Sequence, residues 1–120
     1  TAADRARLAA TGTTVCLCPR SNAHIGVGTA DVPALVAAGV GLCLGTDSLA
    51  SNDDLDLWNE VRCLLARQPD FPPGAILPAL TTTPARLLGR AHDLGLLAPG
   101  AHGGYAVMPA DLEGRLVAGA

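Results

Sequence analysis

The 120-residue chain is 49% hydrophobic and 16% charged, a balance that favours a globular protein over a disordered one. Aromatic residues make up only 2% of the chain, and the basic residues, all arginines, are scattered along a sequence of net charge -3. We therefore expect no nucleic-acid partner, which would need stacking aromatics and a basic surface. No apolar run approaches the roughly 20 residues of a membrane-spanning helix, so no membrane partner is expected either.

The first half of the chain predicts a repeated order of helix, glycine stop and apolar strand. The predicted helices are residues 3–11 and 32–38, and the predicted strands are residues 13–18 and 40–45. Asp31 is the expected N-cap of the second helix, and a polar loop is predicted over residues 20–30. Both strands are almost continuously apolar, which is typical of parallel strands covered on both faces. Because two parallel strands need neighbours, and because the chain opens on Thr1, we expect it to be part of a longer protein.

The second half of the chain predicts a further helix and then a change of texture. This helix spans about residues 55–67, with Asp53 or Asp54 as its N-cap and Trp58 on its apolar face. The other predicted elements are short helices at residues 75–80 and 84–88 and short strands at residues 104–108 and 116–117. The strands that come after residue 94 are expected to belong to a different sheet.

Asp47 stands where the second apolar strand stops. In parallel sheets and in closed barrels, the carboxyl ends of the strands carry ligand-binding and catalytic residues. Asp47 is therefore a candidate for chemistry, although capping of the loop or of the next helix is an equally open interpretation. His24 comes after the first strand and is expected at the same end of the sheet. A catalytic metal usually needs three protein ligands, so any further ligands would come from outside this segment.

The cysteines are Cys16, Cys18, Cys43 and Cys63. None of the spacings is the Cys-x-x-Cys of a zinc knuckle or a redox motif. Cys16 and Cys18 are two apart in a predicted strand and should point to the same face. We interpret these residues as reduced, small core side chains, which predicts a cytoplasmic location.

Two segments carry a resemblance to a known family. Cys18-Pro-Arg-Ser-Asn22 and Leu44-Gly-Thr-Asp-Ser-Leu-Ala-Ser-Asn52 resemble the deaminase and chlorohydrolase branch of the amidohydrolase superfamily. This branch includes cytosine, guanine, adenosylhomocysteine and aminofutalosine deaminases. Thr83-Pro-Ala-Arg-Leu-Leu-Gly89 and Leu94-Gly-Leu-Leu-Ala-Pro-Gly100 are similar to the next segments of the same family.

The resemblance implies an α/β fold made of the last two strand–helix units of a TIM (β/α)8 barrel, with a short C-terminal segment of a flanking β-sandwich after them. The implied domains are residues 1–93 for the barrel part and residues 94–120 for the sandwich segment. The family's His-x-His pair and its later strand histidines are absent from this sequence. The chain is therefore expected to be a C-terminal fragment, with most of the barrel preceding Thr1.

The resemblance also implies a metal-dependent hydrolase of non-peptide carbon–nitrogen bonds. The expected reaction is deamination of an amino-substituted heterocycle or nucleoside-like small molecule by a metal-activated water. Asp47 would be a metal ligand and the proton shuttle, and the cofactor would be a divalent metal, zinc in the first place and iron as the alternative. The implied substrate-side residues are Arg20, Ser21, Asn22 and His24, and the residues expected to hold the loop are Ser51 and Asn52.

A non-catalytic interpretation stays open at this point. The same 120 residues would fit a truncated remnant or a small-molecule binding domain, because a lone aspartate does not complete a metal site. In either case we expect the isolated fragment to be inactive. A homo-oligomer is also left open, since nothing in the sequence decides it.

Overall fold

The computed structural model describes residues 1–116. Its elements are α1 (Ala2–Ala10), β1 (Thr14–Leu17), α2 (Pro19–Ile25), α3 (Val32–Ala37), β2 (Gly41–Leu44), α4 (Leu57–Arg67), η1 (Pro73–Ala75), α5 (Ile76–Leu80), α6 (Thr82–Leu87) and α7 (Ala110–Leu116). The chain divides into two compact units, Thr1–Phe71 and a second unit that begins at Pro72. Both strands, and the loops that leave their carboxyl ends, belong to the first unit.

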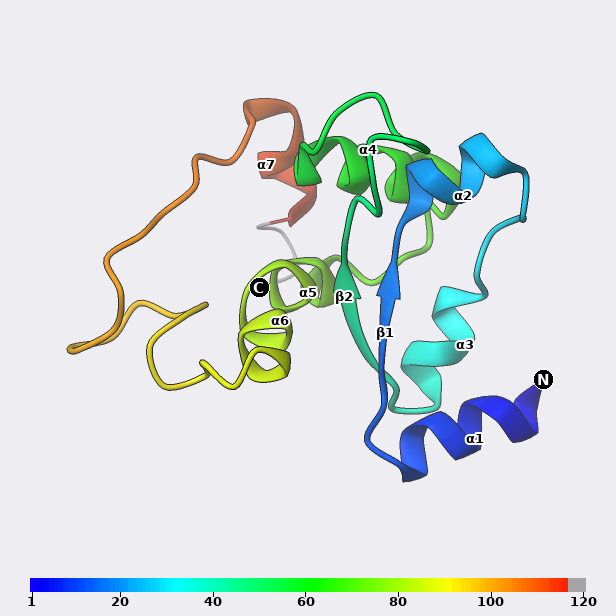
Figure 1. The fold of residues 1–120 in the computed structure, drawn as a ribbon, viewed down its shortest axis with the longest axis horizontal. Helices are drawn as coiled ribbons and strands as arrows, with labels where there is room; N and C mark the ends of the chain where they lie inside the picture. The colour runs from blue at the N-terminus through cyan, green and yellow to red at the C-terminus, as the bar shows by residue number, and fades with distance from the viewer. Residues whose placement is uncertain (117–120) are drawn as a thin grey trace. The chain divides into compact units, whose positions relative to one another are not determined.

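The strands β1 and β2 lie side by side and run parallel, as predicted (Figure 1). Their register places Cys16 opposite Cys43. Helices α2 and α3 connect the two strands. Coverage of both strands is only partly observed, since Leu42, Cys43 and Leu44 are buried whereas Cys16 is exposed. The sheet contains only these two strands within residues 1–116, so β1 lacks a neighbour on its outer edge.

An apolar core holds the first unit together. Its buried members are Leu17, Val32, Leu35, Val40, Leu42, Cys43, Leu44, Val61, Leu64, Leu65 and Phe71. Helices α3 and α4 pack against β2, and α4 also packs against α2. Trp58 on α4 is half-buried. Because α4 contacts both β2 and α2, it can fix the positions of the segments that follow the two strands.

Local signals in the sequence explain most of the boundaries in this unit. The Asp31 carboxylate accepts the N–H of Ala34, so Asp31 caps α3 as predicted. Gly12 and Gly39 stand just after α1 and α3 with φ of +64° and +75°. This left-handed conformation is readily adopted by glycine and ends helices, as the sequence predicted.

The predicted loop over residues 20–30 is wrong in its first half, where α2 forms instead. Pro19 occupies the first turn of α2, where a missing N–H costs nothing because helix starts leave that donor unpaired anyway. Gly26 ends the helix with φ of +71°. The proline ends the strand and starts the helix directly, so no loop is needed between them.

The predicted N-cap of α4 is also wrong. The cap is Asp56, whose Oδ1 accepts the N–H of Trp58 at 2.8 Å. Asp53 has a side chain that is 96% exposed, and Asp54 pairs with the guanidinium of Arg20. The tertiary ion pair therefore takes one of the two predicted capping residues, and the helix begins at Leu57.

The regular secondary structure of the second unit is entirely helical within the described residues, and a long segment without helix or strand separates α6 from α7. Helix α6 begins at Thr82, two residues before its predicted start, and the strand predicted at residues 104–108 is absent. Leu116 belongs to α7, so the strand predicted there is wrong, and Val117 lies outside the described residues. Leu112 and Leu116 are both buried and stand four apart, the spacing of one helix face. The predicted β-sandwich boundary between residues 93 and 94 stays a prediction.

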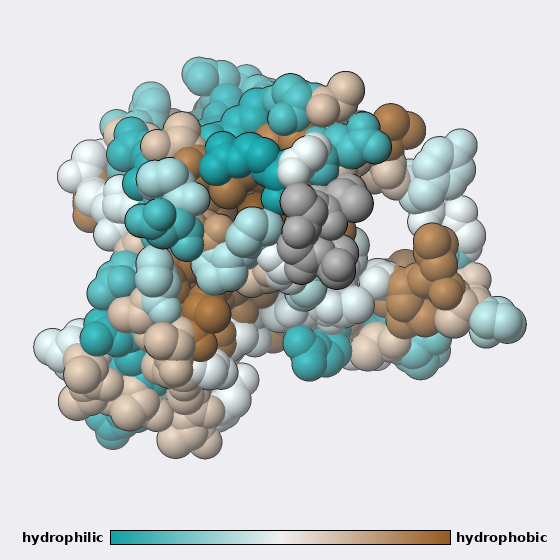
Figure 2. Space-filling model, turned by 180° about the vertical axis from the view of Figure 1, so that it is seen from behind, coloured by the Kyte–Doolittle hydropathy of each residue, from teal (hydrophilic) through white to brown (hydrophobic). Residues whose placement is uncertain are grey.

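Apolar side chains are also exposed, in both units, and brown surface is visible in Figure 2. The large exposed residues include Ile25, Val27, Leu49, Leu55, Leu87, Leu88, Leu97, Tyr105 and Val107. None of the helices formed by residues 1–116 combines the length and apolar character needed to cross a membrane.

Candidate functional site

The candidate site lies where β1 and β2 end. The Gly45 N–H donates to the Leu17 carbonyl at 2.9 Å, which extends the strand pairing by one step. The backbone then turns at Asp47, whose φ is +60°. Asp47 is the one residue other than glycine with a positive φ among residues 1–116. This conformation costs about 1 kcal/mol in an L-residue, and such strain persists only where surrounding contacts hold it.

Two buried hydroxyls orient the Asp47 carboxylate. Ser51 Oγ donates to Asp47 Oδ2 at 2.8 Å, and Ser21 Oγ lies 3.0 Å from the same oxygen. The two hydroxyl oxygens are 2.8 Å apart, and Ser21 and Ser51 are only 2% and 7% exposed. Oδ1 of Asp47 accepts no hydrogen bond from residues 1–116, and the residue is exposed. One oxygen is thus fixed by the protein while the other is available to a ligand.

The loop that follows Asp47 is held by a buried pair, Asn52 and Glu60. Asn52 Nδ2 donates to the Thr46 carbonyl at 2.9 Å and to Glu60 Oε1 at 2.5 Å. Glu60 Oε2 accepts the backbone N–H of Arg20 at 2.9 Å, and the Glu60 side chain is fully buried. These two contacts are consistent with the expected role of Asn52 in holding the loop. Glu60 was not among the residues that the sequence singled out.

The guanidinium of Arg20 is paired with carboxylates of the protein itself. Nη1 lies 2.5 Å from Asp54 Oδ1 and Nη2 lies 3.2 Å from Asp54 Oδ2, so the pair is bidentate, and Asp53 lies farther away at 3.4 Å. The hydrogen bond from Arg20 holds the pKa of the Asp54 carboxyl below its ordinary value, and the same bond raises the pKa of Arg20. A substrate that reached this guanidinium would compete with Asp54.

Two predicted substrate-side residues lie apart from this network. Asn22 lines a small pocket. The other lining residues are Leu17, Pro19, Gly28, Thr29, Ala30, Val32, Leu64, Arg67 and Gln68. His24 is exposed in the last turn of α2. The structure therefore brings Ser21, Ser51 and Asp47 together, and it does not join Asn22 or His24 to them through hydrogen bonds.

The cysteine thiols are all free, as predicted. Cys43 is buried, whereas Cys16 is exposed, so the core placement predicted for Cys16 is wrong. Cys18 is half-buried, and desolvation raises its pKa to about 11, with neighbouring Cys16 adding to the rise. A thiol with such a pKa is protonated at neutral pH and is a poor nucleophile.

The donor atoms present fit one ligand of a metal site. Among residues 1–116, no group of three or more His, Cys, Asp or Glu side chains is placed so that it could hold a metal ion. Asp47 offers one exposed carboxylate oxygen, a hard donor that suits zinc and other divalent cations. The described residues therefore supply a single anionic ligand at the strand ends, and a complete site needs others.

Comparison with known proteins identifies the family. A model of the amidohydrolase family matches residues 1–114. The chain belongs to the amidohydrolase family. The resemblance seen in its motifs is thereby confirmed, and it extends over nearly the whole chain.

Related amidohydrolases include several deaminases. The chain is 42% identical over 86 residues to the aminodeoxyfutalosine deaminase of Deinococcus radiodurans, a match that covers 72% of this chain and 21% of the relative. It is 38% identical over 111 residues to the 8-oxoguanine deaminase of Pseudomonas aeruginosa, covering 88% of this chain and 24% of that one. A third relative, the hydroxydechloroatrazine ethylaminohydrolase of a Pseudomonas species, is 43% identical over 109 residues, covering 83% of this chain and 22% of the relative. The matched part thus spans about a fifth to a quarter of these curated relatives.

A solved structure supports the same assignment. An adenosine deaminase from Xanthomonas campestris, crystallised with bound zinc, superposes with a TM-score of 0.72 at 33% sequence identity. The match covers 79% of this chain and 23% of that enzyme. The α/β character of the chain agrees with this neighbour.

Proposed function

We propose that this chain is part of a metal-dependent amidohydrolase that removes an amino group from a heterocyclic or nucleoside-like substrate. Its membership of the amidohydrolase family and its deaminase relatives support hydrolytic deamination. The proposed architecture is the last two strand–helix units of a TIM barrel. A cytoplasmic location is part of the same proposal. The non-catalytic alternative is not favoured, because the relatives named above are enzymes.

The observation that carries the proposal is the environment of the two Asp47 carboxylate oxygens. Asp47 stands just beyond a parallel strand, its Oδ2 is fixed by Ser21 and Ser51, and its Oδ1 is available. A metal ligand needs this combination, since an oriented carboxylate binds with less loss of side-chain freedom. The proposed metal is zinc, with iron as the alternative, and the zinc named with the Xanthomonas deaminase supports this order. The remaining ligands would come from parts of the barrel that residues 1–116 do not include.

The chemistry proposed for Asp47 is proton transfer. When bound, a divalent metal supplies a nucleophile by lowering the pKa of water toward ~7. The Asp47 carboxylate would accept one proton of the attacking water as its oxygen bonds to the ring carbon. It would then donate that proton to the departing amino group, which leaves as ammonia, while the second water proton ends on the adjacent ring nitrogen and a carbonyl forms on the ring. Ser21 and Ser51 would keep the carboxylate in one orientation through both transfers.

The substrate side of the site is proposed to include Arg20, Ser21, Asn22 and His24. The Ser21 hydroxyl contacts Asp47, and the Arg20 guanidinium contacts Asp54. His24 is exposed and stays available for a direct contact. Of these four residues, we therefore expect His24 substitutions to change KM most selectively.

Ammonia release from the complete, zinc-loaded protein tests the proposal. Adenosine-type and guanine-type compounds would be assayed with the wild type, Asp47→Asn and Asp70→Asn. Asp70 is an exposed aspartate far from the strand ends in sequence, so Asp70→Asn is a matched control. We expect kcat to fall by about 100-fold or more in Asp47→Asn, in the range of a lost general acid–base group, and to be unchanged in Asp70→Asn. Absence of ammonia release by the wild type, or full activity of Asp47→Asn, would contradict the proposal.

A further inference from the structure

We infer that Glu60 is a positioning residue for Asp47, which it reaches through helix α2 and through the loop that leaves β2. The inference rests on the function proposed for Asp47. Glu60 lies in the first turn of α4, and its side chain has no solvent exposure. A buried carboxylate is costly unless hydrogen bonds compensate it, so its partners show what it holds in place.

The first connection passes through Asn52. The amide Nδ2 of Asn52 has two hydrogens, and it donates one to Glu60 Oε1 and the other to the Thr46 carbonyl. Asn52 Oδ1 accepts the N–H of Asp53 at 3.1 Å. All the polar groups of this amide are therefore used, and its orientation is defined by Glu60. Because Thr46 immediately precedes Asp47, this connection fixes the peptide that enters the strained turn.

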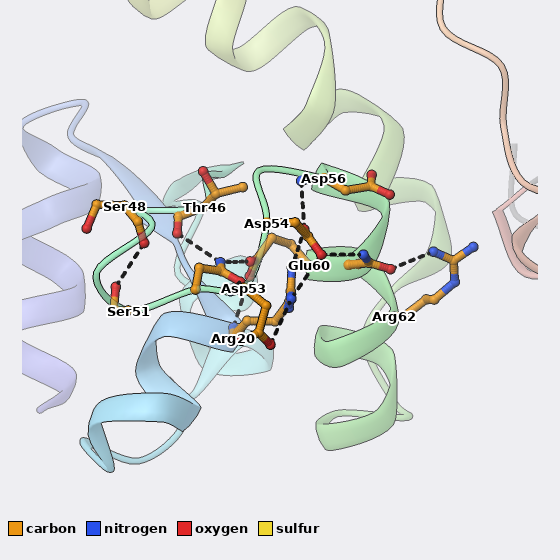
Figure 3. A network of polar contacts seen from close by, with 11 residues as sticks. Arg20, Thr46, Ser48, Ser51, Asp53, Asp54, Asp56, Glu60 and Arg62 are labelled. Carbon is orange, nitrogen blue, oxygen red and sulfur yellow. Dashed lines mark hydrogen bonds and ion pairs between the residues drawn. The ribbon is translucent and has the colours of Figure 1, made fainter.

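The second connection passes through Arg20. Glu60 Oε2 accepts the backbone N–H of Arg20 at 2.9 Å. The next residue is Ser21, whose hydroxyl lies 3.0 Å from Asp47 Oδ2. Glu60 thereby binds the first turn of α2 and the loop after β2 at once, one oxygen to each (Figure 3). The backbone and the carboxylate of Asp47 both depend on this one buried side chain.

Glu60→Gln breaks this arrangement without changing side-chain size. A glutamine has one acceptor oxygen, whereas the site has two donors to satisfy, from Arg20 and Asn52. Either the Arg20 N–H or the Asn52 amide then faces the NH2 group of the glutamine and loses its acceptor. Glu113→Gln is the matched control, because Glu113 is exposed on α7 and the chemical change is the same.

The double variant Asn52→Asp with Glu60→Gln separates positioning from stability. The amide introduced at position 60 could donate to the carboxylate introduced at position 52 and accept from the Arg20 N–H. The buried pair is then restored with reversed polarity and unchanged total charge. However, a carboxylate at position 52 cannot donate to the Thr46 carbonyl. The double variant therefore recovers the buried contact and the bond to Arg20, and it leaves the connection through Thr46 to Asp47 broken.

The experiment measures three quantities on the complete protein. These are hydrogen exchange over residues 45–52 in the metal-free state, zinc affinity by competition with a chelator, and kcat with KM. We expect Glu60→Gln to raise exchange in this loop about 10-fold. We expect zinc affinity and kcat to fall about 10-fold or more, as for other groups that orient a metal ligand, while KM changes little. Glu113→Gln should match the wild type in all three.

The double variant decides between the two roles. We expect it to regain thermal stability relative to Glu60→Gln while its zinc affinity and kcat stay low. Recovery of zinc affinity and kcat together with stability would overturn the inference, since Glu60 would then act only in packing. Unchanged loop exchange in Glu60→Gln would also overturn it. A wild type without zinc binding or turnover would instead refute the proposed function, and the exchange measurement would still decide whether Glu60 holds the loop.

Discussion

The hydroxyl of Ser51 donates to Oδ2 of Asp47 across four residues of one loop, at a distance of 2.8 Å. The Asp47 carboxylate is therefore held by a side chain of its own loop. Ser21 reaches the same oxygen from α2 in the neighbouring strand–helix connection. A conformation that is unfavourable for aspartate is thus held by contacts from two directions, which is the usual condition for strain at a functional site.

The two serines should act on Asp47 as a coupled pair. Ser21→Ala and Ser51→Ala each remove one buried hydroxyl and should each lower the free energy of unfolding by about 1 kcal/mol. Either single variant leaves one donor on Oδ2, whereas the double variant leaves none, so the effects should deviate from additivity by about 0.5 kcal/mol or more. Urea denaturation of the four proteins measures this coupling. Ser48→Ala is the control, because Ser48 is exposed, and strict additivity of the pair would contradict the account.

The N-cap of α4 gives a second prediction. Asp56→Ala removes the acceptor of the Trp58 N–H and should cost about 1 kcal/mol of stability. Asp53→Ala removes a residue that the sequence proposed as the cap, but its side chain is 96% exposed. We expect its effect on the unfolding free energy to stay below about 0.5 kcal/mol. Comparable losses in the two variants would show that the helix begins earlier than Leu57.

The Arg20–Asp54 pair predicts a pH dependence. Hydrogen bonding to Arg20 lowers the pKa of Asp54 from its ordinary value of 3.8. The folded state therefore favours the ionised carboxylate, so this contribution to stability is fully present above pH 3.8 and is lost as the pH falls through the lower folded value. Asp54→Asn should be less stable than the wild type at pH 7, and the difference should shrink below pH 3.8. Chemical denaturation across this range measures the difference, and a constant gap would contradict the prediction.

Two glycines in the second unit should respond differently to alanine. Gly95 has φ of +74°, and a Cβ there would lie 2.5 Å from the Thr81 carbonyl oxygen. Gly100 has φ of +86°, but its Cβ would meet nothing within 4 Å. Gly100→Ala should cost about 1 kcal/mol for conformation alone, and Gly95→Ala at least about 1 kcal/mol more because the backbone must move. Thermal denaturation of both variants checks this order. Equal losses would indicate that the Thr81 contact relaxes freely.

Local signals were sufficient to predict much of the first unit. Asp31 and Gly39 bound α3, and the two apolar runs become parallel strands. Helix α2 was missed because the polar residues after Pro19 were interpreted as a loop, whereas a proline is well suited to the first turn of a helix. The residues at 104–108 have a strand-like composition, but a strand needs a pairing partner that local sequence does not reveal.

The candidate site was predicted only in part, because the sequence reveals residues that are close along the chain and not those brought together by folding. Asp47 was found because a carboxylate directly after an apolar strand is unusual, and Ser51 and Asn52 lie close to it in sequence. Glu60 was missed because its partners, Arg20 and Asn52, are distant along the chain. A signal did exist. Glu60 stands four residues before the buried Leu64, which places a carboxylate on the inner face of the helix.

Zinc affinity of the complete protein tests whether Asp47 is a metal ligand. The wild type and Asp47→Asn would be dialysed against zinc buffered by a chelator, with Asp70→Asn as the control. Asparagine keeps the size of the side chain but removes the charge that an available carboxylate offers to the metal. We predict that Asp47→Asn binds zinc at least about 10-fold more weakly than the wild type, while Asp70→Asn binds it equally well. Equal zinc affinity in the wild type and Asp47→Asn would contradict the assignment of Asp47 as a metal ligand.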